Sequence, residues 1–472
     1  MSTFANAIKN QETTTTNGMK ARVSTSSALV DFFYAVGASR GKNIIPAFSA
    51  ANSENMNLAG RIALWARDIR GGAGERQVFR DILKHLATNN PDQARALMHK
   101  IPEIGRWDDL FVFVGTDLEK DAFSMYAEAL EARNGLAAKW ADRKGPIAAK
   151  FREFLGWTPK FYRKRLVELT KVVENQMCAK EWDKINFNHV PSVASSRYKK
   201  AFYKHVPNLY QKWASDAVKG ENGAKVNASA VYPYDVIKGV GSYGFSSSNL
   251  DHIRAQWNAL PNYVGDSSVL ALVDVSGSMI CRAGGVTSKS DTTCLDVAVS
   301  LGLYFADKNK GKFKDCFLTF SSSPELLYLK GDIISKINQM IKSTWQMSTN
   351  LHTAFEKILS VAIKNSVPAD EMPETLLILS DMQFNSCVTH GDSAIEMITR
   401  KYENAGYKVP KVVFWNLNSS YKNVPVEHTK SGVALVSGFS PAIAKSILSS
   451  NLDEFSPENI MMQTIMNPRY DY

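Results

Sequence analysis

The sequence lacks several features that would assign it to common classes of protein. No apolar run reaches the roughly 18 residues that a membrane-spanning helix needs, and residues 1–22 contain no apolar core of a secretory signal. Cysteine is scarce: the five cysteines are scattered and form no Cys-x-x-Cys pair. We therefore expect a cytoplasmic protein without a membrane partner, whose cysteines are reduced, buried thiols.

Motifs of hydrolytic enzymes are also missing. The eight histidines are dispersed, and none lies in a His-Glu-x-x-His frame. The glycine-rich segment 70–76 lacks the Gly-Lys-Ser/Thr ending of a nucleotide-binding loop. We interpret it as a tight turn between helices, with Arg70 and Arg76 paired to Asp108 or Asp109, although a phosphate cradle remains an alternative. The sequence therefore does not predict an enzyme.

Positive charge is concentrated in the first part of the chain. Residues 1–265 carry 37 lysines and arginines against 25 aspartates and glutamates, whereas the remainder carries 19 against 21. Residues 151–200 alone carry 11 basic and 5 acidic residues. This asymmetry favours a polyanionic partner for the N-terminal part. The alternative is a basic surface that serves only solubility.

Two groups of basic residues adjoin aromatic residues, a pattern that suits single-stranded RNA because cations follow phosphates and rings stack on bases. The alternative is that the rings belong to the core and the cations to a solvated helix face. The candidate RNA-binding residues in these groups are Arg163, Lys164, Arg165, Arg197, Lys199, Lys200 and Lys204.

The pattern of apolar residues divides the chain into two structural classes. From residue 26 to about 220, apolar residues recur every three or four positions between short polar breaks, which predicts stacked helices. From residue 267 onward, short apolar strands alternate with helical segments, which predicts a doubly wound, mostly parallel sheet. The predicted strands are 268–274, 315–320, 325–329, 375–380, 411–416 and 433–436, of which 325–329 is antiparallel.

These patterns predict an α + α/β protein, with a helical-repeat (HEAT-like) solenoid or ring followed by a doubly wound domain. The predicted boundaries are 1–25 for a flexible N-terminus, 26–220 for the helical domain, 221–265 for a connector, 266–455 for the sheet domain and 456–472 for a C-terminal tail.

Hard oxygen ligands follow the first strand of the predicted sheet. Residues 269–279 read Val-Leu-Ala-Leu-Val-Asp-Val-Ser-Gly-Ser-Met, so a carboxylate and two hydroxyls lie at the carboxyl end of a buried strand. Thr349, in a later loop, and Asp381, after another buried strand, supply further oxygen atoms. Such ligands suit Mg²⁺ or Mn²⁺. The candidate metal ligands are Asp274, Ser276, Ser278, Thr349 and Asp381.

The order of these three motif pieces resembles the metal-ion-dependent adhesion site of von Willebrand factor type A domains. A helical-repeat domain followed by a type A domain resembles the TROVE proteins, the Ro autoantigen type of RNA-binding protein. Segments 67–76, 104–110, 380–384, 413–417 and 432–439 are similar to bacterial, phage and plant relatives of that type. Residues 182–191 resemble the Trp…His-x-x-Pro segment of the TROVE domain, and this resemblance adds His189 to the candidate RNA contacts.

The resemblance implies a ring of helices closed by the type A domain, which holds noncoding RNA by single-stranded 3′ ends or as structured small RNA. We expect a monomer whose divalent-metal site recruits a protein partner. The first alternative is a protein-complex scaffold without RNA, and the second is a metal-dependent RNA-processing enzyme.

Overall fold

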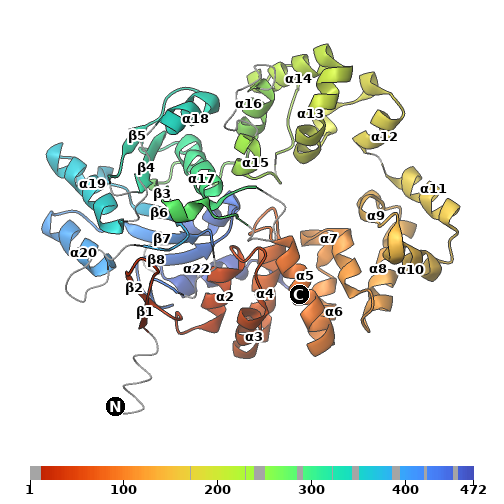
Figure 1. The fold of residues 1–472 in the computed structure, drawn as a ribbon, viewed down its shortest axis with the longest axis horizontal. Helices are drawn as coiled ribbons and strands as arrows, with labels where there is room; N and C mark the ends of the chain where they lie inside the picture. Colours follow the sequence, from red (N-terminus) through yellow and green to blue (C-terminus); the bar gives the residue numbers. More distant parts are fainter. Residues whose placement is uncertain are drawn as a thin grey trace.

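The computed structural model describes residues 12–170, 172–228, 230–238, 250–283, 291–320, 323–342, 350–384, 394–418, 423–449 and 455–472. Helices occupy most of the chain up to residue 258, and a six-stranded sheet with flanking helices follows (Figure 1). None of the described helices is long and apolar enough to cross a membrane.

The sheet has the architecture that the strand–helix alternation predicts. Its strand order is β5-β4-β3-β6-β7-β8, and every pairing is parallel except that of β5 with β4. Long apolar runs form these strands because both faces of a parallel sheet are covered. The strands are β3 (Val269–Asp274), β4 (Cys316–Phe320), β5 (Leu326–Tyr328), β6 (Thr375–Ser380), β7 (Lys411–Asn416) and β8 (Val433–Ser437).

Successive side chains of each strand enter two different cores. Ala271 and Val273 of β3 pack with α17 and α18, whereas Leu270 and Leu272 pack with α19 and α20 on the opposite face. The sheet is therefore doubly wound. The helices after β3 are α17 (Cys294–Lys308), α18 (Ile333–Lys342), α19 (Leu351–Lys364), α20 (Ala394–Asn404), α21 (Ala444–Leu448) and α22 (Pro457–Ile465), with short 3-10 turns η6 (Gly277–Ile280), η7 (Ala369–Glu371), η8 (Pro441–Ile443) and η10 (Pro468–Tyr470).

The helical half follows an arc that returns to the sheet through α15 and α16 (Figure 1). Its helices are α2 (Ala28–Val36), α3 (Ile45–Glu54), α4 (Met56–Arg67), α5 (Arg76–Asn89), α6 (Pro91–Met98), α7 (Ile101–Ile104), α8 (Glu119–Glu131), α9 (Gly135–Trp140), α10 (Gly145–Leu155), α11 (Pro159–Leu169), α12 (Val173–Cys178), α13 (Ser192–His205), α14 (Pro207–Lys219), α15 (Pro233–Ile237) and α16 (Leu250–Asn258), with 3-10 turns η1 (Trp107–Phe113), η2 (Trp182–Lys184) and η3 (Phe187–His189). The HEAT-like character of this array stays a prediction.

The N-terminal segment differs from the flexible one that we predicted. Residues 12–25 are ordered: β1 (Glu12–Thr14) and β2 (Lys20–Arg22) form an antiparallel hairpin. The hairpin is held from outside, because Thr15 Oγ1 donates to the Phe384 carbonyl at 2.5 Å and Arg22 exchanges backbone hydrogen bonds with Val424. Contacts with the sheet half thus hold this segment in place, because a segment so polar has no apolar core of its own.

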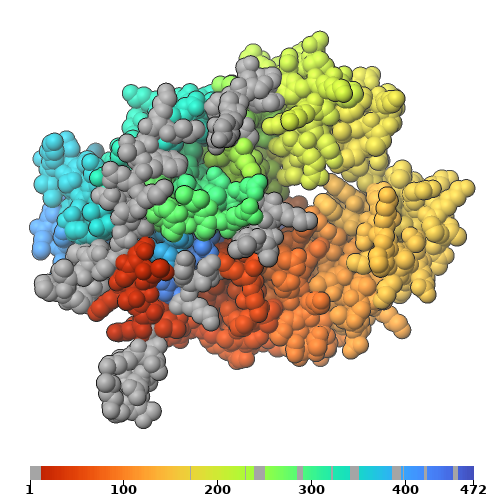
Figure 2. Space-filling model, in the orientation of Figure 1, coloured from red at the N-terminus to blue at the C-terminus, as the bar shows by residue number. Residues whose placement is uncertain are grey.

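Segments from the first and last described parts of the chain meet at the junction of the two halves. The amide of Gly37, after α2, donates to Ser437 Oγ of β8 at 2.9 Å. Arg469 of η10 forms an ion pair with Asp68, after α4, at 2.5 Å. One apolar core therefore runs from α2 through α11 into the sheet, and Figure 2 shows the first described residues, in red, beside the blue C-terminal part.

Helices α12 to α14 form a lobe with a small core of their own, in which Phe187, Phe202 and Tyr210 meet. The lobe is attached to α16: Tyr210 Oη lies 2.9 Å from His252 Nδ1, and Gln256 Nε2 donates to Ser192 Oγ at 2.6 Å. Figure 2 shows the surface hollowed between this yellow-green lobe and the orange helices below it.

Candidate functional site

Asp274 is the last residue of β3 and lies at the carboxyl edge of the sheet, fully buried. Ser380, at the end of the neighbouring strand β6, donates to Asp274 Oδ2 at 2.5 Å, and the amide of Ser276 donates to Oδ1 at 2.9 Å. These two hydrogen bonds therefore fix the orientation of the Asp274 carboxylate.

Asp381 follows β6 at the same edge and is 1% exposed. Its Oδ1 accepts from the amide of Gln383 at 3.2 Å, but its buried Oδ2 has no hydrogen-bond partner among the described residues. A buried carboxylate oxygen without a donor is costly, which indicates a position for a missing positive charge.

The electrostatics of the two carboxylates agree with that geometry. Burial, and then the negative charge of Asp381, raise the pKa of Asp274 from 3.8 to about 7. Burial also raises the pKa of Asp381, although the hydroxyl of Ser278 opposes the effect. A divalent cation between the two groups would offset their desolvation and their mutual repulsion.

The two predicted serines line the loop after β3. Ser276 is buried, Ser278 is exposed, and their hydroxyl oxygens lie 3.1 Å apart. Thr349 lies outside the described residues. The structure thus brings Asp274, Ser276, Ser278 and Asp381 to one edge. The donor set of two carboxylates and two hydroxyls fits a hard divalent cation, and among the described residues no group of three or more His, Cys, Asp or Glu offers a different metal site.

Sequence reasoning missed several neighbours of this site. Gln383, two residues after Asp381, is held by the N-terminal hairpin: its Oε1 accepts from the amide of Thr16 and its carbonyl from Asn17 Nδ2, both at 2.8 Å. Ser380 precedes Asp381 directly and was open to prediction from that adjacency. The hairpin was not, because about 365 residues separate it from Gln383.

Two cysteines also lie beside the site. Cys281 follows η6, Cys294 begins α17, and their sulfur atoms are 3.4 Å apart. Among the described cysteines all are free thiols, but Cys178 is exposed and Cys281 and Cys316 are partly exposed, so the prediction of buried thiols is confirmed only for Cys294. Cys178 lies at the end of the short helix α12, where few apolar neighbours remain to cover it.

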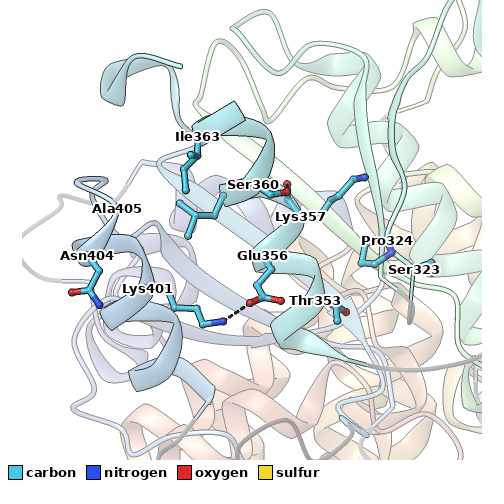
Figure 3. Close-up of a pocket in the computed structure, with 11 residues that line it drawn as sticks. Ser323, Pro324, Thr353, Glu356, Lys357, Ser360, Ile363, Lys401, Asn404 and Ala405 are labelled. Atoms are coloured by element: carbon cyan, nitrogen blue, oxygen red, sulfur yellow. Dashed lines mark hydrogen bonds and ion pairs between the residues drawn. The ribbon is translucent and has the colours of Figure 1, made fainter. Parts of the chain in front are cut away.

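His352 belongs to a different feature. Its Nε2 lies 2.6 Å from Lys401 Nζ and 3.0 Å from Glu356 Oε1. Figure 3 shows Lys401 of α20 pointing toward Glu356 of α19, across an open groove of about 830 Å³. His352 therefore serves a polar contact between two helices.

The predicted RNA-binding cations fall on two helices. Arg163 and Lys164 of α11 are exposed, whereas Arg165 is partly buried and pairs with Glu168 at 3.1 Å. On α13, Arg197, Lys200 and Lys204 are exposed and Lys199 is partly buried. Apart from Arg165, these cations form no ion pair with a described residue. Burial, and then the charge of Lys200, lower the pKa of Lys199.

The aromatic residues near these cations divide between core and surface. Tyr162 and Phe202 are buried core residues, while Phe161 is 51% exposed. His189 is exposed at the end of η3 and lines a groove of about 460 Å³ between the end of α11 and the lobe. Of these rings, those of Phe161 and His189 are available to a ligand.

The glycine-rich segment is structural, as we interpreted it, but with different ion pairs. Arg67 and Arg80 bind the buried Asp109 at 2.8 and 2.6 Å, whereas no ion pair of Arg70 or Arg76 with a described residue is found. A Cβ atom at Gly72 would lie 1.9 Å from the carbonyl of Trp65, so the turn requires glycine. The amides of Gly72, Ala73 and Glu75 already donate to backbone carbonyls, so they are not free to cradle a phosphate.

Comparison with known proteins gives three findings. Family models described as domains of unknown function match residues 268–467 (DUF7788) and 148–270 (DUF2828). The crystal structure of the Ro (RSR) protein of Deinococcus radiodurans aligns with a TM-score of 0.46 and 15% identity, covering 94% of this chain and 100% of that chain.

The third finding concerns the whole sequence. The uncharacterized protein L728 of Acanthamoeba polyphaga mimivirus is 31% identical over an alignment 521 positions long, which covers 96% of this chain and 88% of L728. With this identity over nearly its full length, the chain belongs to the same protein family as L728.

Proposed function

We propose that this protein binds RNA, of the noncoding type held by Ro proteins, on the basic surface of its helical half, and that a Mg²⁺ or Mn²⁺ ion at the edge of its sheet recruits a protein partner. The observation that carries the RNA proposal is the set of basic side chains on α11 and α13 that have no acidic partner among the described residues.

Unpaired surface cations support RNA binding because they are free to replace the counterions of a phosphate backbone. They lie on the half of the chain that holds the whole positive surplus, and the exposed ring of Phe161 adjoins them. Phosphate contacts position RNA without reading its sequence, so we expect broad binding with strong salt dependence.

The test is fluorescence anisotropy with labelled single-stranded RNA and the full chain at several salt concentrations. Reversing two charges on α11 (Arg163→Glu with Lys164→Glu) should weaken binding and reduce the salt slope by about 1.4, since each phosphate contact contributes about 0.7 for single strands. The matched control reverses two exposed lysines of the sheet half, Lys330→Glu with Lys408→Glu. Equal weakening by both variants would contradict the assignment.

We further propose that the RNA enters by a single-stranded 3′ end. A hollow lies between the α12–α14 lobe and the orange helices below it (Figure 2), which supports this idea, and the candidate cations lie on α11 and α13. RNA with a 3′ tail should then bind more tightly than a blunt duplex, whose bases are hidden from stacking. Equal affinity for both RNAs would contradict entry by a 3′ end without contradicting RNA binding itself.

For the metal, Asp274, Ser276, Ser278 and Asp381 would hold the ion, together with Thr349. When bound, the cation would supply a Lewis-acidic position for a carboxylate of the partner. The unpartnered Oδ2 of Asp381 supports the proposal. Among the described residues at this edge, no side chain is positioned as a nucleophile with its base, so we do not propose catalysis.

Calorimetry with Mn²⁺ tests the metal site. Asp274→Ala should abolish binding, because it removes one of the two carboxylates that would hold the ion. The control Asp370→Ala removes an exposed carboxylate of the same half. Unchanged Mn²⁺ affinity in Asp274→Ala would overturn the metal site. A wild type that binds the metal but no RNA would instead indicate a protein scaffold that works without RNA.

A further inference from the structure

Cys281 and Cys294 face each other across a short antiparallel pairing. The amide of Cys294 donates to the carbonyl of Cys281, and the amide of Ala283 donates to the carbonyl of Thr292, both at 2.9 Å. Between these two hydrogen bonds, Arg282 and Thr293 form an isolated antiparallel β-bridge. Residues directly opposite in such a pairing have Cα atoms about 5.5 Å apart, within the range of about 4.4–6.8 Å that a disulfide spans. The sulfurs, 3.4 Å apart, need only a small movement to bond.

The surroundings of the pair suit a reactive thiol. Cys281 is partly exposed, so a small oxidant reaches its sulfur, whereas Cys294 is 1% exposed. Asn418 Nδ2 donates to the Cys281 sulfur at 3.3 Å, and Lys42 Nζ donates to Asn418 Oδ1. A nearby amide and ammonium group stabilise negative charge on sulfur.

We propose that Cys281 and Cys294 are a redox-active pair that a hydroperoxide converts to a disulfide. The Cys281 sulfur attacks the terminal peroxide oxygen, which breaks the O–O bond and gives a sulfenic acid and an alcohol or water. The Cys294 sulfur then displaces the sulfenic hydroxyl as water and forms the S–S bond. The two thiols lose two electrons and two protons in total, and the peroxide gains them.

The bond would act on the loop that carries two of the proposed metal ligands. Ser276 precedes η6 and Cys281 follows it, so a disulfide to α17 would tether the C-terminal end of the turn that contains Ser278. The pair itself does not depend on the proposed function, because its geometry stands without a metal or an RNA.

The experiment treats the full-length protein with one equivalent of hydrogen peroxide, alkylates the remaining thiols and maps the peptides by mass spectrometry. The free thiols should fall from the five in the sequence to three, and a single linked peptide should join Cys281 to Cys294. Cys281→Ser and Cys294→Ser should each lose the linked peptide, while Cys178→Ser and Cys316→Ser should keep it.

A second measurement guards against variants that misfold. Alkylating Cys281 in the native wild type before peroxide treatment should prevent the bridge without any substitution. A bridge that involves Cys387 or two copies of Cys178 would overturn the proposal. So would a wild type in which Cys281 accumulates as sulfinic acid while Cys294 stays free.

Discussion

Arg40 joins three elements of the fold through one guanidinium group. Its Nε lies 2.7 and 2.8 Å from the two carboxylate oxygens of Glu75, its Nη1 donates to Tyr234 Oη at 3.3 Å, and its charge lies 4.3 Å over the ring of Phe439. Glu75 is 2% exposed. Burial raises its pKa although Arg40 lowers it, so the carboxylate depends on this partner.

Arg40→Leu should therefore destabilise the protein strongly, by about 3–5 kcal/mol, because it leaves a buried carboxylate without its cation. Urea unfolding followed by circular dichroism measures the change. The matched control is Arg95→Leu, whose ion pairs to Asp92 and Asp121 are exposed and should contribute little. Similar losses in the two variants would show that burial of Glu75 does not matter.

His252 gives the stability a predictable pH dependence. Burial, and then the charge of Lys199, lower its pKa from 6.5 to about 4, and its Nε2 has no hydrogen-bond partner among the described residues. Between these two values the unfolded chain binds a proton that the native protein does not. The free energy of unfolding should thus fall, by at most about 3 kcal/mol, as the pH drops from about 6.5 to 4.

His252→Gln removes that proton while keeping a polar side chain. The stability difference between wild type and variant, measured by urea unfolding at several pH values, should shrink through this window as the wild type weakens. If the stabilities of wild type and variant instead changed in parallel with pH, His252 would have the same pKa in the native and unfolded states.

Among single residues, the positions of Asp274 and Asp381 could be predicted because each stands at the carboxyl end of an apolar run that is typical of a buried strand. Their strands, β3 and β6, are neighbours in the sheet. Cys281, Cys294 and Lys42 could not be found, since nothing in their local sequence indicates that tertiary folding brings them together.

At the scale of elements, the parallel strands were predictable to within about a residue because they are continuous apolar runs bounded by polar loops. Helices were harder. The apolar spacing of residues 196–219 predicts one helix, but the structure has two, since Pro207 cannot continue α13 and instead begins α14. Helix α3 has no clear periodic signal, because its apolar residues do not gather on one face. The hairpin of β1 and β2 had a signal in Asn17-Gly18, a turn dipeptide between threonine-rich and basic residues.

Gly18 tests how firmly that hairpin is held. It has a φ of 90°, where a branched side chain is strained, so Gly18→Val should loosen the hairpin. Hydrogen exchange should then speed up at the amides of Thr16 and Arg22, which bond to Gln383 and Val424. Gly406→Val, at a φ of 77° beyond α20, is the control and should leave both amides protected. Unchanged exchange in Gly18→Val would contradict the role of the turn.

At the scale of the molecule, the two halves share one large core. Apolar residues from α2 to α11 and from the sheet belong to one cluster, and α22 packs against α2, α4 and β8. The sequence could not show this sharing, because periodicity reports the face that a helix buries but not the distant element that covers it. The domain boundaries at residues 25, 220, 265 and 455 stay predictions.

Removing residues 456–472 should consequently destabilise the helical half as well as the sheet. The truncation uncovers α4 and leaves Asp68, whose side chain is fully buried, without Arg469 and Tyr470. Calorimetry should show one cooperative transition in the full chain and a markedly lower midpoint in the truncated one. Arg469→Ala should give part of the same loss. Two independent transitions in the full chain would contradict the shared core.

The packing of early helices against late segments of the chain also bears on how the protein folds during synthesis. The partners of Gly37 and Asp68, Ser437 and Tyr470, are about 400 residues later in the sequence. At a synthesis rate of about 5–20 residues per second, α2 and α4 leave the ribosome on the order of half a minute before the segments that cover them. During that interval the apolar faces of the first helices are open to other nascent chains, so we expect the emergence of β8 and η10, rather than that of the helical half, to set the moment at which α2 and α4 become covered.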